Sequence, residues 1–325
     1  MIIDKSEVSR ILVITLSNVG DIILTTPVIR TLVKEFPEAR IDVMVGPSGK
    51  EVFERDPKVF KLIIYDKHMP ISEKRRLQLK LKKLKYDLVV DIRNTIFPLL
   101  IGPKYRTATI QKFPRTIAHK KSKHLHLLKS LGIIEFEERS YIHIPKEDDD
   151  HAAALLKECG ITPPIVIINA GAKSHLKRWT EEGFAELADG LMSECGANVV
   201  FVGLKDDEAI VNRINARMKK KAYTFVNRTN IRQLAALLRR AKLLITNDSA
   251  PLHIGCAVGT NVLAIFGPTD PAKYGPTGEF DVVINRKLSC SPCESAVCAQ
   301  NYECMKLITA DEAFDAAKVM LEGYE

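Results

Sequence analysis

The stretch that decides the fold spans residues 245–276 and reads ITNDSAPLHIGCAVGTNVLAIFGPTDPAKYGP. A short apolar run at 241–245 predicts a buried strand, which ends at the polar turn containing Asp248 and Ser249 and is followed by a helical stretch. A second strand is predicted at 262–266, before a Gly-Pro-Thr-Asp-Pro loop. Strand, turn, helix and strand form a βαβ unit, whose first turn lies where parallel-sheet proteins bind ligands. The Ser249 hydroxyl and the unpaired N–H groups of that helix start suit a diphosphate.

The length and composition describe an ordinary globular chain of two domains. Its 325 residues exceed one typical core of about 150 residues, and 46% are hydrophobic and 27% charged. No apolar run reaches the roughly 20 residues that span a bilayer, and the N-terminus predicts a first strand instead of a signal peptide. We therefore expect a cytoplasmic protein. A net charge of +8 fits a polyanionic partner, namely nucleic acid, anionic lipid or a phosphorylated glycan, and equally fits a protein without one.

The first half of the chain alternates predicted strands with predicted helices. Apolar residues at three-to-four spacing predict one helix over 22–33. Strands are predicted at 10–16, 41–45, 62–65 and 88–92. This alternation predicts an α/β fold with a parallel, doubly wound sheet. The string G-x-G-x-x-G is absent from the chain, which argues against a dinucleotide-dependent dehydrogenase.

Asp21 follows Gly20 at the carboxyl end of the first predicted strand. Because ligands of open α/β sheets bind beyond the carboxyl ends of the strands, its carboxylate is a candidate functional group. An aspartate before a helix also commonly caps free N–H groups. Position alone leaves both interpretations open.

Two basic stretches lie in the same half. Residues 72–85, SEKRRLQLKLKKLK, predict a basic helix that is either a solvated face or a contact with anionic lipid head groups or a phosphorylated acceptor. Residues 112–123, KFPRTIAHKKSK, contain Arg115 and Lys120, and Arg93 follows the strand at 88–92. Only 6% of the residues are aromatic, so no stacking platform for nucleic acid is expected.

The second half repeats the strand-and-turn pattern. Acidic residues at 147–150 open a helix, and Gly160 with Pro163-Pro164 ends it, which predicts domains of 1–162 and 163–325. A strand at 165–168 leads into a basic loop before Trp179, the single tryptophan, which we expect to pack between helix and strand. A lysine close to a diphosphate neutralises its charge and stabilises it as a leaving group.

Four of the seven cysteines are crowded near the C-terminus as Cys290-x2-Cys293-x4-Cys298-x5-Cys304. Such crowding is compatible with a structural zinc or iron–sulfur site or with disulfides. The absence of an export signal argues against disulfides. We expect no metal in the chemistry, with a structural metal at these cysteines as the weaker alternative.

Four motifs occur in a recognisable order: GDIILTTPVIR at 20–30, NAGAKSHLKRW at 169–179, DSAPLH at 248–253 and FGPTDP at 266–271. Together they resemble glycosyltransferase family 9, the ADP-heptose:lipopolysaccharide heptosyltransferases. The resemblance implies a GT-B fold, in which two Rossmann-like, doubly wound domains face each other across a cleft. The N-terminal domain would bind the acceptor and the C-terminal domain the nucleotide sugar. It also implies that the last helix, at about 311–322, packs back across the domain junction.

The resemblance assigns roles to individual residues. Asp21 corresponds to the general base, and Lys177 stabilises the leaving group, with Arg178 as its alternative. Ala250 stands where the family commonly has glycine. The implied donor-binding residues are Gly171, Ala172, Lys173, Arg178, Asp206, Asp207, Asp248, Ser249, Ala250, His253 and Thr269. The implied acceptor-binding residues are Gly20, Arg93, Arg115 and Lys120.

The expected reaction is inverting transfer of heptose from ADP-heptose to the inner core of lipopolysaccharide, either Kdo–lipid A or an already heptosylated core. No cofactor is expected. The enzyme would be a monomer that contacts the anionic cytoplasmic face of the inner membrane and binds no nucleic acid. Two alternatives stay open: a transferase of the same family with another sugar donor or glycan acceptor, and a non-catalytic nucleotide- or lipid-binding protein of the same fold.

Overall fold

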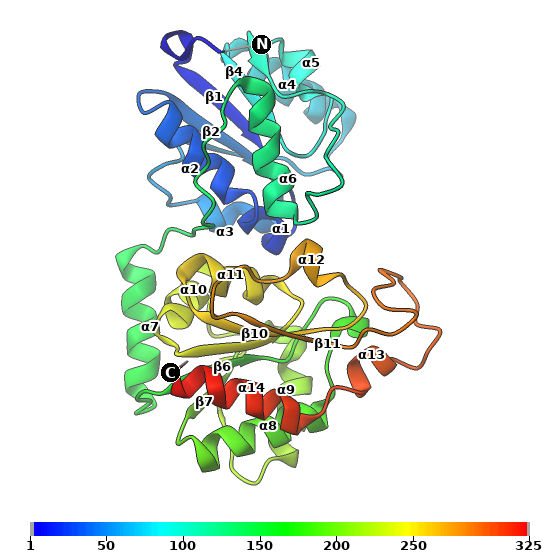
Figure 1. Ribbon diagram of the computed structural model, residues 1–325. Helices are drawn as coiled ribbons and strands as arrows, with labels where there is room; N and C mark the ends of the chain where they lie inside the picture. Colours follow the sequence, from blue (N-terminus) through cyan, green and yellow to red (C-terminus); the bar gives the residue numbers. More distant parts are fainter. Residues whose placement is uncertain (1–2, 324–325) are drawn as a thin grey trace. The chain divides into compact units, whose positions relative to one another are not determined.

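The computed structural model describes residues 3–323 and divides the chain into two compact units, Met1–His143 and Ile144–Glu325. Each unit has its own parallel sheet with helices packed on it (Figure 1). The α/β prediction is therefore confirmed for both halves. The division falls between His143 and Ile144 and not between residues 162 and 163, as the proline pair had predicted.

The first unit is built on a five-stranded sheet of order β3-β2-β1-β4-β5, with all neighbours parallel. Its strands are β1 (Arg10–Ile14), β2 (Arg40–Val45), β3 (Lys61–Ile64), β4 (Leu88–Asp91) and β5 (Tyr105–Arg106). Its α-helices are α1 (Val19–Ile23), α2 (Thr26–Glu35), α3 (Lys50–Phe53), α4 (Ile71–Lys83), α5 (Phe97–Ile101) and α6 (Lys120–His126). Short 3-10 turns occupy Lys5–Glu7, Pro47–Gly49 and Leu127–Leu131.

The single helix predicted over 22–33 is two helices, α1 and α2. Pro27 causes the break because it has no N–H to donate to the preceding turn. Threonine hydroxyls take over the exposed carbonyls: Thr25 Oγ1 donates to Ile22 O at 2.7 Å and Thr26 Oγ1 to Ile23 O at 2.7 Å. The prediction of one helix was wrong because the apolar spacing continues past Pro27, whereas the helical hydrogen bonds do not.

The second unit has a six-stranded sheet of order β11-β10-β9-β6-β7-β8, again parallel throughout. Its strands are β6 (Ile165–Asn169), β7 (Asn198–Phe201), β8 (Tyr223–Thr224), β9 (Leu243–Asn247), β10 (Asn261–Phe266) and β11 (Val282–Asn285). Its α-helices are α7 (Lys146–Glu158), α8 (Glu181–Glu194), α9 (Glu208–Arg217), α10 (Ile231–Arg240), α11 (Ala250–Val258), α12 (Pro271–Tyr274), α13 (Glu303–Lys306) and α14 (Ala310–Glu322). Short 3-10 turns lie at His175–Lys177 and Lys205–Asp207.

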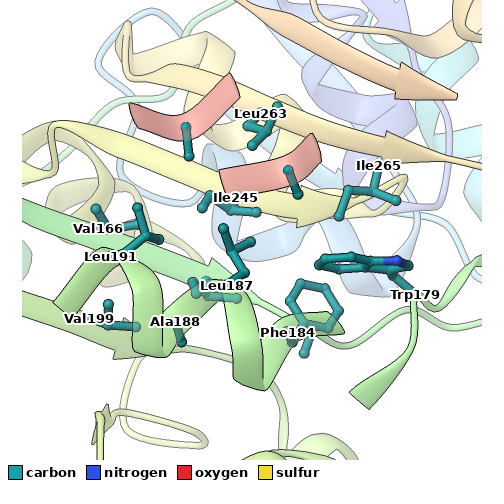
Figure 2. Close-up of a cluster of buried hydrophobic side chains, with 14 of the residues drawn as sticks. Val166, Trp179, Phe184, Leu187, Ala188, Leu191, Val199, Ile245, Leu263 and Ile265 are labelled. Atoms are coloured by element: carbon teal, nitrogen blue, oxygen red, sulfur yellow. The ribbon is translucent and has the colours of Figure 1, made fainter. Parts of the chain in front are cut away.

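One buried cluster holds the second unit together (Figure 2). Strand residues such as Ile245 and Leu263 meet Leu187 and Leu191 of α8 there. Trp179 lies in the same cluster with its ring edge-on to Phe184, at 5.0 Å between centroids, and its Nε1 donates to Ile308 O at 3.0 Å. The packing role expected for Trp179 is confirmed.

Buried charge explains why α7 belongs to the second unit. Asp148 of α7 accepts a hydrogen bond from Arg232 Nε of α10 at 2.6 Å, and both side chains are almost fully buried. Asn230 Nδ2 donates to the second oxygen of Asp148 at 3.2 Å. Because these bonds fix α7 to α10, the boundary precedes this helix, and the glycine and prolines that follow it mark a loop inside the unit.

The last helix also stays within the second unit. Ala313, Ala317 and Met320 of α14 join the core cluster of Figure 2, and α14 lies against α8 (Figure 1). Gly190 of α8 permits this approach, since a Cβ there would come within 2.9 Å of the Phe314 ring. The apolar face of α14 thus packs on α8 within the second unit, and the expectation that residues 311–322 pack back across the domain junction stays a prediction. Within residues 3–323, no helix combines the length and the apolar character that crossing a bilayer requires.

The strand orders create one switch point in each sheet, where successive connections leave in opposite directions and a crevice opens beyond the carboxyl ends. In the first sheet it lies between β1 and β4, and in the second between β6 and β9. Asp21 follows β1, and Arg93 follows β4. Asp248 follows β9. Strand order thus places the predicted residues at the ligand-binding edges of their own sheets.

Candidate active site

Three side chains meet at the switch point of the second sheet. Lys177 Nζ donates to Asp248 Oδ2 at 2.6 Å, and Thr269 Oγ1 donates to the same oxygen at 2.6 Å. The Asp248 side chain is 7% exposed and that of Lys177 is 30% exposed. A nearly buried carboxylate thus holds a partly exposed ammonium group where a diphosphate could reach it. The three residues come from three different loops, and the structure brings them together as the resemblance implied.

Ser249 lies at the N-cap of α11 but does not cap it with its side chain. Its hydroxyl instead accepts a hydrogen bond from Asn169 Nδ2 at 3.0 Å and lies 3.2 Å from Thr246 Oγ1. The amide of Asn169 also donates to Gly171 O at 2.8 Å. This network ties the turn after β6 to the turn after β9. Pro251 has no N–H and Leu252 N donates to Ser249 O at 3.2 Å, so Ala250 supplies the backbone N–H group at this helix start. Asn169 and Thr246 were not among the predicted site residues.

Asn247 fixes the basic loop from the other side. Its Oδ1 accepts from Trp179 N at 3.0 Å, and its Nδ2 donates to Ala170 O at 2.9 Å. Arg178 points back to its own loop, where Nε donates to Ala172 O at 2.9 Å. The geometry therefore distinguishes the two candidate cations, because Lys177 pairs with Asp248 whereas Arg178 donates to a carbonyl of its own loop. An asparagine at the end of an apolar strand is the sequence signal that could have indicated Asn247.

The acidic loop after β7 also separates its two candidate residues. Asp207 accepts a hydrogen bond from Leu204 N at 2.9 Å and so closes its own turn. It lies so close to Gly171 that a Cβ there would come within 2.3 Å of the carboxylate. Asp206 is exposed. The structure thus explains why residue 171 is glycine and leaves two exposed carboxylates here, Asp206 and Glu208, the first residue of α9.

Ala250 and His253 both belong to α11. Ala250 is its first residue and has helical backbone, so the added Cβ causes no backbone strain at a position where the family commonly has glycine. His253 lies one turn further along and is largely buried. Lys173 is exposed at the surface of the basic loop. Ala250 and His253 thus follow Asp248 and Ser249 on α11, and Lys173 lies in the basic loop that also contains Lys177.

Asp21 lies in the first turn of α1, and Asn18, not Asp21, is the N-cap residue. The capping alternative is therefore excluded. The half-buried carboxylate accepts a hydrogen bond from Asn18 Nδ2 at 3.1 Å. A short turn, residues 15–18, connects the end of β1 to the start of α1, and it places Asp21 just beyond the carboxyl end of β1.

A buried histidine contacts the end of α1, the helix that carries Asp21. His124 of α6 contacts Leu24 O, the C-cap carbonyl of α1, at 3.2 Å through its Nδ1. Burial lowers the pKa of His124 to about 4, although the hydrogen bond to Leu24 and the charge of Asp21 act in the opposite direction. The imidazole is therefore neutral at neutral pH. His124 was not predicted as a site residue, because a histidine directly after the basic stretch 112–123 suggests exposure.

The other acceptor-side candidates lie on different loops of the first unit. The Arg93 guanidinium lies over the ring of Tyr65, 5.4 Å from its centroid. The backbone N–H of Arg93 donates to Asp91 Oδ1 at 2.9 Å. Lys120 is the first residue of α6. Arg115 lies in the exposed loop before α6. Arg93 and Lys120 are half-buried, so Arg115 is the most accessible cation of the three.

The four C-terminal cysteines line one small cavity of about 20 Å³, together with Leu176 and Pro268. They are free thiols, and nearby thiols together with burial raise the pKa of Cys304. Across residues 3–323 no group of three or more His, Cys, Asp or Glu side chains is arranged to hold a metal ion. The cavity has room for about one water molecule, so it is too small for a nucleotide sugar. The cysteine loop instead supports the donor side, because Ser291 Oγ donates to Gly267 O at 2.6 Å.

Comparison with known proteins agrees with this geometry. The model of glycosyltransferase family 9 (heptosyltransferase) matches residues 111–303. Lipopolysaccharide heptosyltransferase 3 of Escherichia coli is 28% identical over 283 residues, which cover 79% of this chain and 83% of that protein. The crystal structure of a family 9 glycosyltransferase from Veillonella parvula matches with a TM-score of 0.83 at 25% identity and covers 97% of both chains. The structure of the E. coli ADP-heptose lipopolysaccharide heptosyltransferase II shares the fold, with a TM-score of 0.77, 23% identity and 96% and 98% coverage.

Two parallel-sheet units with polar groups at both switch points define a glycosyltransferase of the GT-B fold. Within that class, the chain belongs to glycosyltransferase family 9, the heptosyltransferases. The predicted fold class and enzyme class are thereby confirmed.

Proposed function

We propose that the protein is an inverting heptosyltransferase that transfers heptose from ADP-heptose to the inner core of lipopolysaccharide. The observation that carries this proposal is the Lys177–Asp248–Thr269 cluster beside the N-terminus of α11. A fixed ammonium group next to the N-terminus of a helix is suited to a diphosphate. The names of the relatives supply the sugar and the acceptor class. The acceptor is Kdo–lipid A or an already heptosylated core.

In the proposed reaction, Asp21 removes a proton from the acceptor hydroxyl. The resulting oxygen nucleophile attacks the anomeric carbon of the heptose from the face opposite the diphosphate. A new C–O bond forms while the bond to the diphosphate breaks, and ADP leaves with the electron pair. One displacement of this kind inverts the anomeric configuration. The hydrogen bond from Asn18 holds the Asp21 carboxylate for this step.

The second unit stabilises the departing charge. Lys177 lies on Asp248 and remains partly exposed, so its ammonium group can neutralise the new charge on ADP. The Ser249 hydroxyl and the Ala250 N–H would contact the same diphosphate, and Asp206 or Glu208 is the candidate for the ribose. Because these cationic and N–H donors neutralise the diphosphate, we propose that the reaction needs no cofactor or divalent metal. The reaction further requires that the first unit present its acceptor to the donor held by the second.

The protein is proposed to act as a monomer at the cytoplasmic face of the inner membrane, where a lipopolysaccharide precursor is anchored. Two alternatives remain distinct from this proposal: a family 9 transferase with another donor or acceptor, and a nucleotide-binding protein without transferase activity. The intact Asp21 and the Lys177–Asp248 pair favour an enzyme over the second alternative.

Isothermal titration of the purified protein with ADP, UDP and GDP, each with EDTA and then with magnesium, tests the donor. We expect binding of ADP to exceed that of UDP and GDP and to persist in EDTA. Incubation with ADP-heptose and Kdo–lipid A should then release ADP and extend the acceptor by one heptose. Preference for UDP or GDP would overturn the donor, and ADP binding without transfer to either core acceptor would overturn the acceptor.

A further inference from the structure

The outer face of α4 is strongly basic. Its inner face packs in a buried cluster with α5, through Leu81 of α4 and Phe97 and Ile101 of α5. The helix and the two residues after it, 71–85, contain seven Lys or Arg and one Glu, a net charge of +6 in a chain whose total is +8. Most of the protein's excess positive charge therefore lies on one helix of the first unit.

Large apolar side chains are exposed beside these charges. On α4, Ile71 is 82% exposed, and in the neighbouring segment Ile96 is 65% and Leu99 52% exposed. The two helices contact each other and lie close together in Figure 1. We define the α4–α5 surface as the exposed apolar residues Ile71, Leu79, Ile96, Leu99 and Leu100 together with the exposed basic residues Arg75, Arg76, Lys80, Lys82 and Lys83.

Apolar side chains set among Lys and Arg match the chemistry of an anionic bilayer surface. The apolar groups enter the boundary between head groups and acyl chains, while each basic group adds about 1 kcal/mol near negatively charged lipid. A phosphorylated sugar alone would pair with the cations but would leave the isoleucine and leucine side chains in water. The combination therefore favours a bilayer over a phosphorylated sugar as the partner.

The N-terminal end of α4 and the start of α5 lie near the edge of the sheet that carries the candidate base. Ile71 follows the carboxyl end of β3, Ile96 follows that of β4, and Asp21 follows that of β1. Because these strands are parallel, all three residues lie toward the same edge of the first sheet. A bilayer bound there would present a lipid-anchored acceptor on the side of Asp21.

We propose that the α4–α5 surface docks the protein on an anionic membrane surface, with its basic side chains on lipid phosphates and Ile71, Ile96 and Leu99 at the acyl boundary. This inference rests on the proposed function, since it concerns how a lipid-anchored acceptor is reached. Its test, however, measures membrane binding without any sugar substrate.

The first experiment is flotation of the full-length protein with phosphatidylcholine vesicles, with and without phosphatidylglycerol. We expect binding only to the phosphatidylglycerol vesicles, weaker at high salt. The triple variant Arg75→Glu, Arg76→Glu and Lys83→Glu should reduce binding at least about tenfold. The control variant Lys157→Glu, Lys220→Glu and Lys221→Glu makes the same charge change at exposed positions of the second unit and should bind like the wild type. Equal loss in both variants, or no vesicle binding by the wild type, would overturn the proposal.

A second pair of variants tests the apolar part. Ile96→Ser with Leu99→Ser should weaken binding at high salt, where charge attraction is screened. Ile134→Ser with Val297→Ser removes equally exposed apolar residues elsewhere and should have no effect. Circular dichroism and thermal unfolding confirm that each variant is folded.

Nucleotide binding separates this proposal from the proposed function. If ADP binds and the anionic vesicles do not, the docking surface is wrong and the donor assignment stands. If vesicles bind and no nucleotide does, the reverse holds. An α4 variant that still binds vesicles but no longer uses a phosphorylated acceptor would overturn docking in favour of direct acceptor contact.

Discussion

Two aspartates follow strand ends in this protein, and their surroundings differ. Asp248 is nearly buried and accepts hydrogen bonds from Lys177 and Thr269 through one oxygen. Asp21 is half-buried and accepts a hydrogen bond from the neutral side chain of Asn18. At the residue scale, the two hydrogen bonds of Asp248 fit the positioning of Lys177, and Asp21 is our proposed base.

Replacement of Asp21 by asparagine should reduce heptose transfer by about 10²–10⁴-fold, because the amide preserves the shape but cannot accept the proton. ADP affinity, measured by calorimetry, should stay unchanged, since the nucleotide-binding residues are in the second unit. The control Asn18→Ala removes only the hydrogen bond to Asp21 and should cause a smaller loss. Near-normal turnover of Asp21→Asn would remove Asp21 from the role of base.

Replacement of Lys177 by methionine should lower turnover by about 10²–10³-fold and weaken ADP binding, because the leaving diphosphate loses its cation. Lys173→Met, in the same loop but exposed, is the matched control and should have a small effect. Steady-state rates with saturating acceptor measure both. If the two variants behave in the opposite order, the cation that serves the diphosphate is Lys173.

His124 makes the stability of the first unit depend on pH. Its folded pKa of about 4 lies below the unfolded value of about 6.5, so the unfolded chain binds the proton more readily. The stabilisation is complete above pH 6.5 and is lost as the pH falls toward 4, by up to about 3 kcal/mol. Urea unfolding from pH 7 to pH 4 should show this loss in the wild type and much less of it in His124→Asn. The exposed His68→Gln variant should keep the slope of the wild type; if it also flattens the profile, the effect does not belong to His124.

At the scale of elements, the positions of α7 and α14 depend on contacts that their own sequences do not predict. The position of α7 depends on Asp148 meeting Arg232, a residue that lies far along the chain on α10. The position of α14 depends on small residues, Gly190 on α8 and Ala317 on α14, that let two helices approach closely. Arg232 belongs to the second unit, so α7 does too, and the domain boundary predicted between residues 162 and 163 was wrong.

Asp148→Ala should reduce the free energy of unfolding of the second unit by about 3–5 kcal/mol, because the buried guanidinium of Arg232 loses its carboxylate. The double variant Asp148→Leu with Arg232→Met removes both charges and should recover most of that loss. Asp150→Ala is the control: its pair with Lys146 is exposed, so the change should stay below about 1 kcal/mol. Urea unfolding followed by tryptophan fluorescence reports on this unit, because Trp179 lies in its core. A double variant no more stable than Asp148→Ala would contradict the charge explanation.

At the scale of the whole molecule, each unit has its own sheet, its own buried core and its own switch point. The second unit holds the cluster around Asp248 entirely within itself. Nucleotide binding should therefore not require the first unit.

A fragment of residues 144–325 should fold and bind ADP with an affinity close to that of the full chain. A fragment of residues 163–325 lacks α7 and should be markedly less stable, since α10 then loses its buried ionic partner. Circular dichroism, thermal unfolding and calorimetry compare the two fragments. Equal stability of both would contradict a boundary at residue 143 and support one at residue 162.

The sequence by itself determined the alternation of strands and helices, the parallel sheets, the family and the loops that carry Asp21, Lys177 and Asp248. Those features are local: apolar periodicity sets the elements, and polar turns stand directly after the strands. Only the tertiary structure decided that Lys177 rather than Arg178 pairs with Asp248, that Asn18 rather than Asp21 is the N-cap residue of α1, and where the two units divide. Each of these depends on contacts between residues distant in sequence or on the exact course of a turn, and a one-dimensional pattern contains neither.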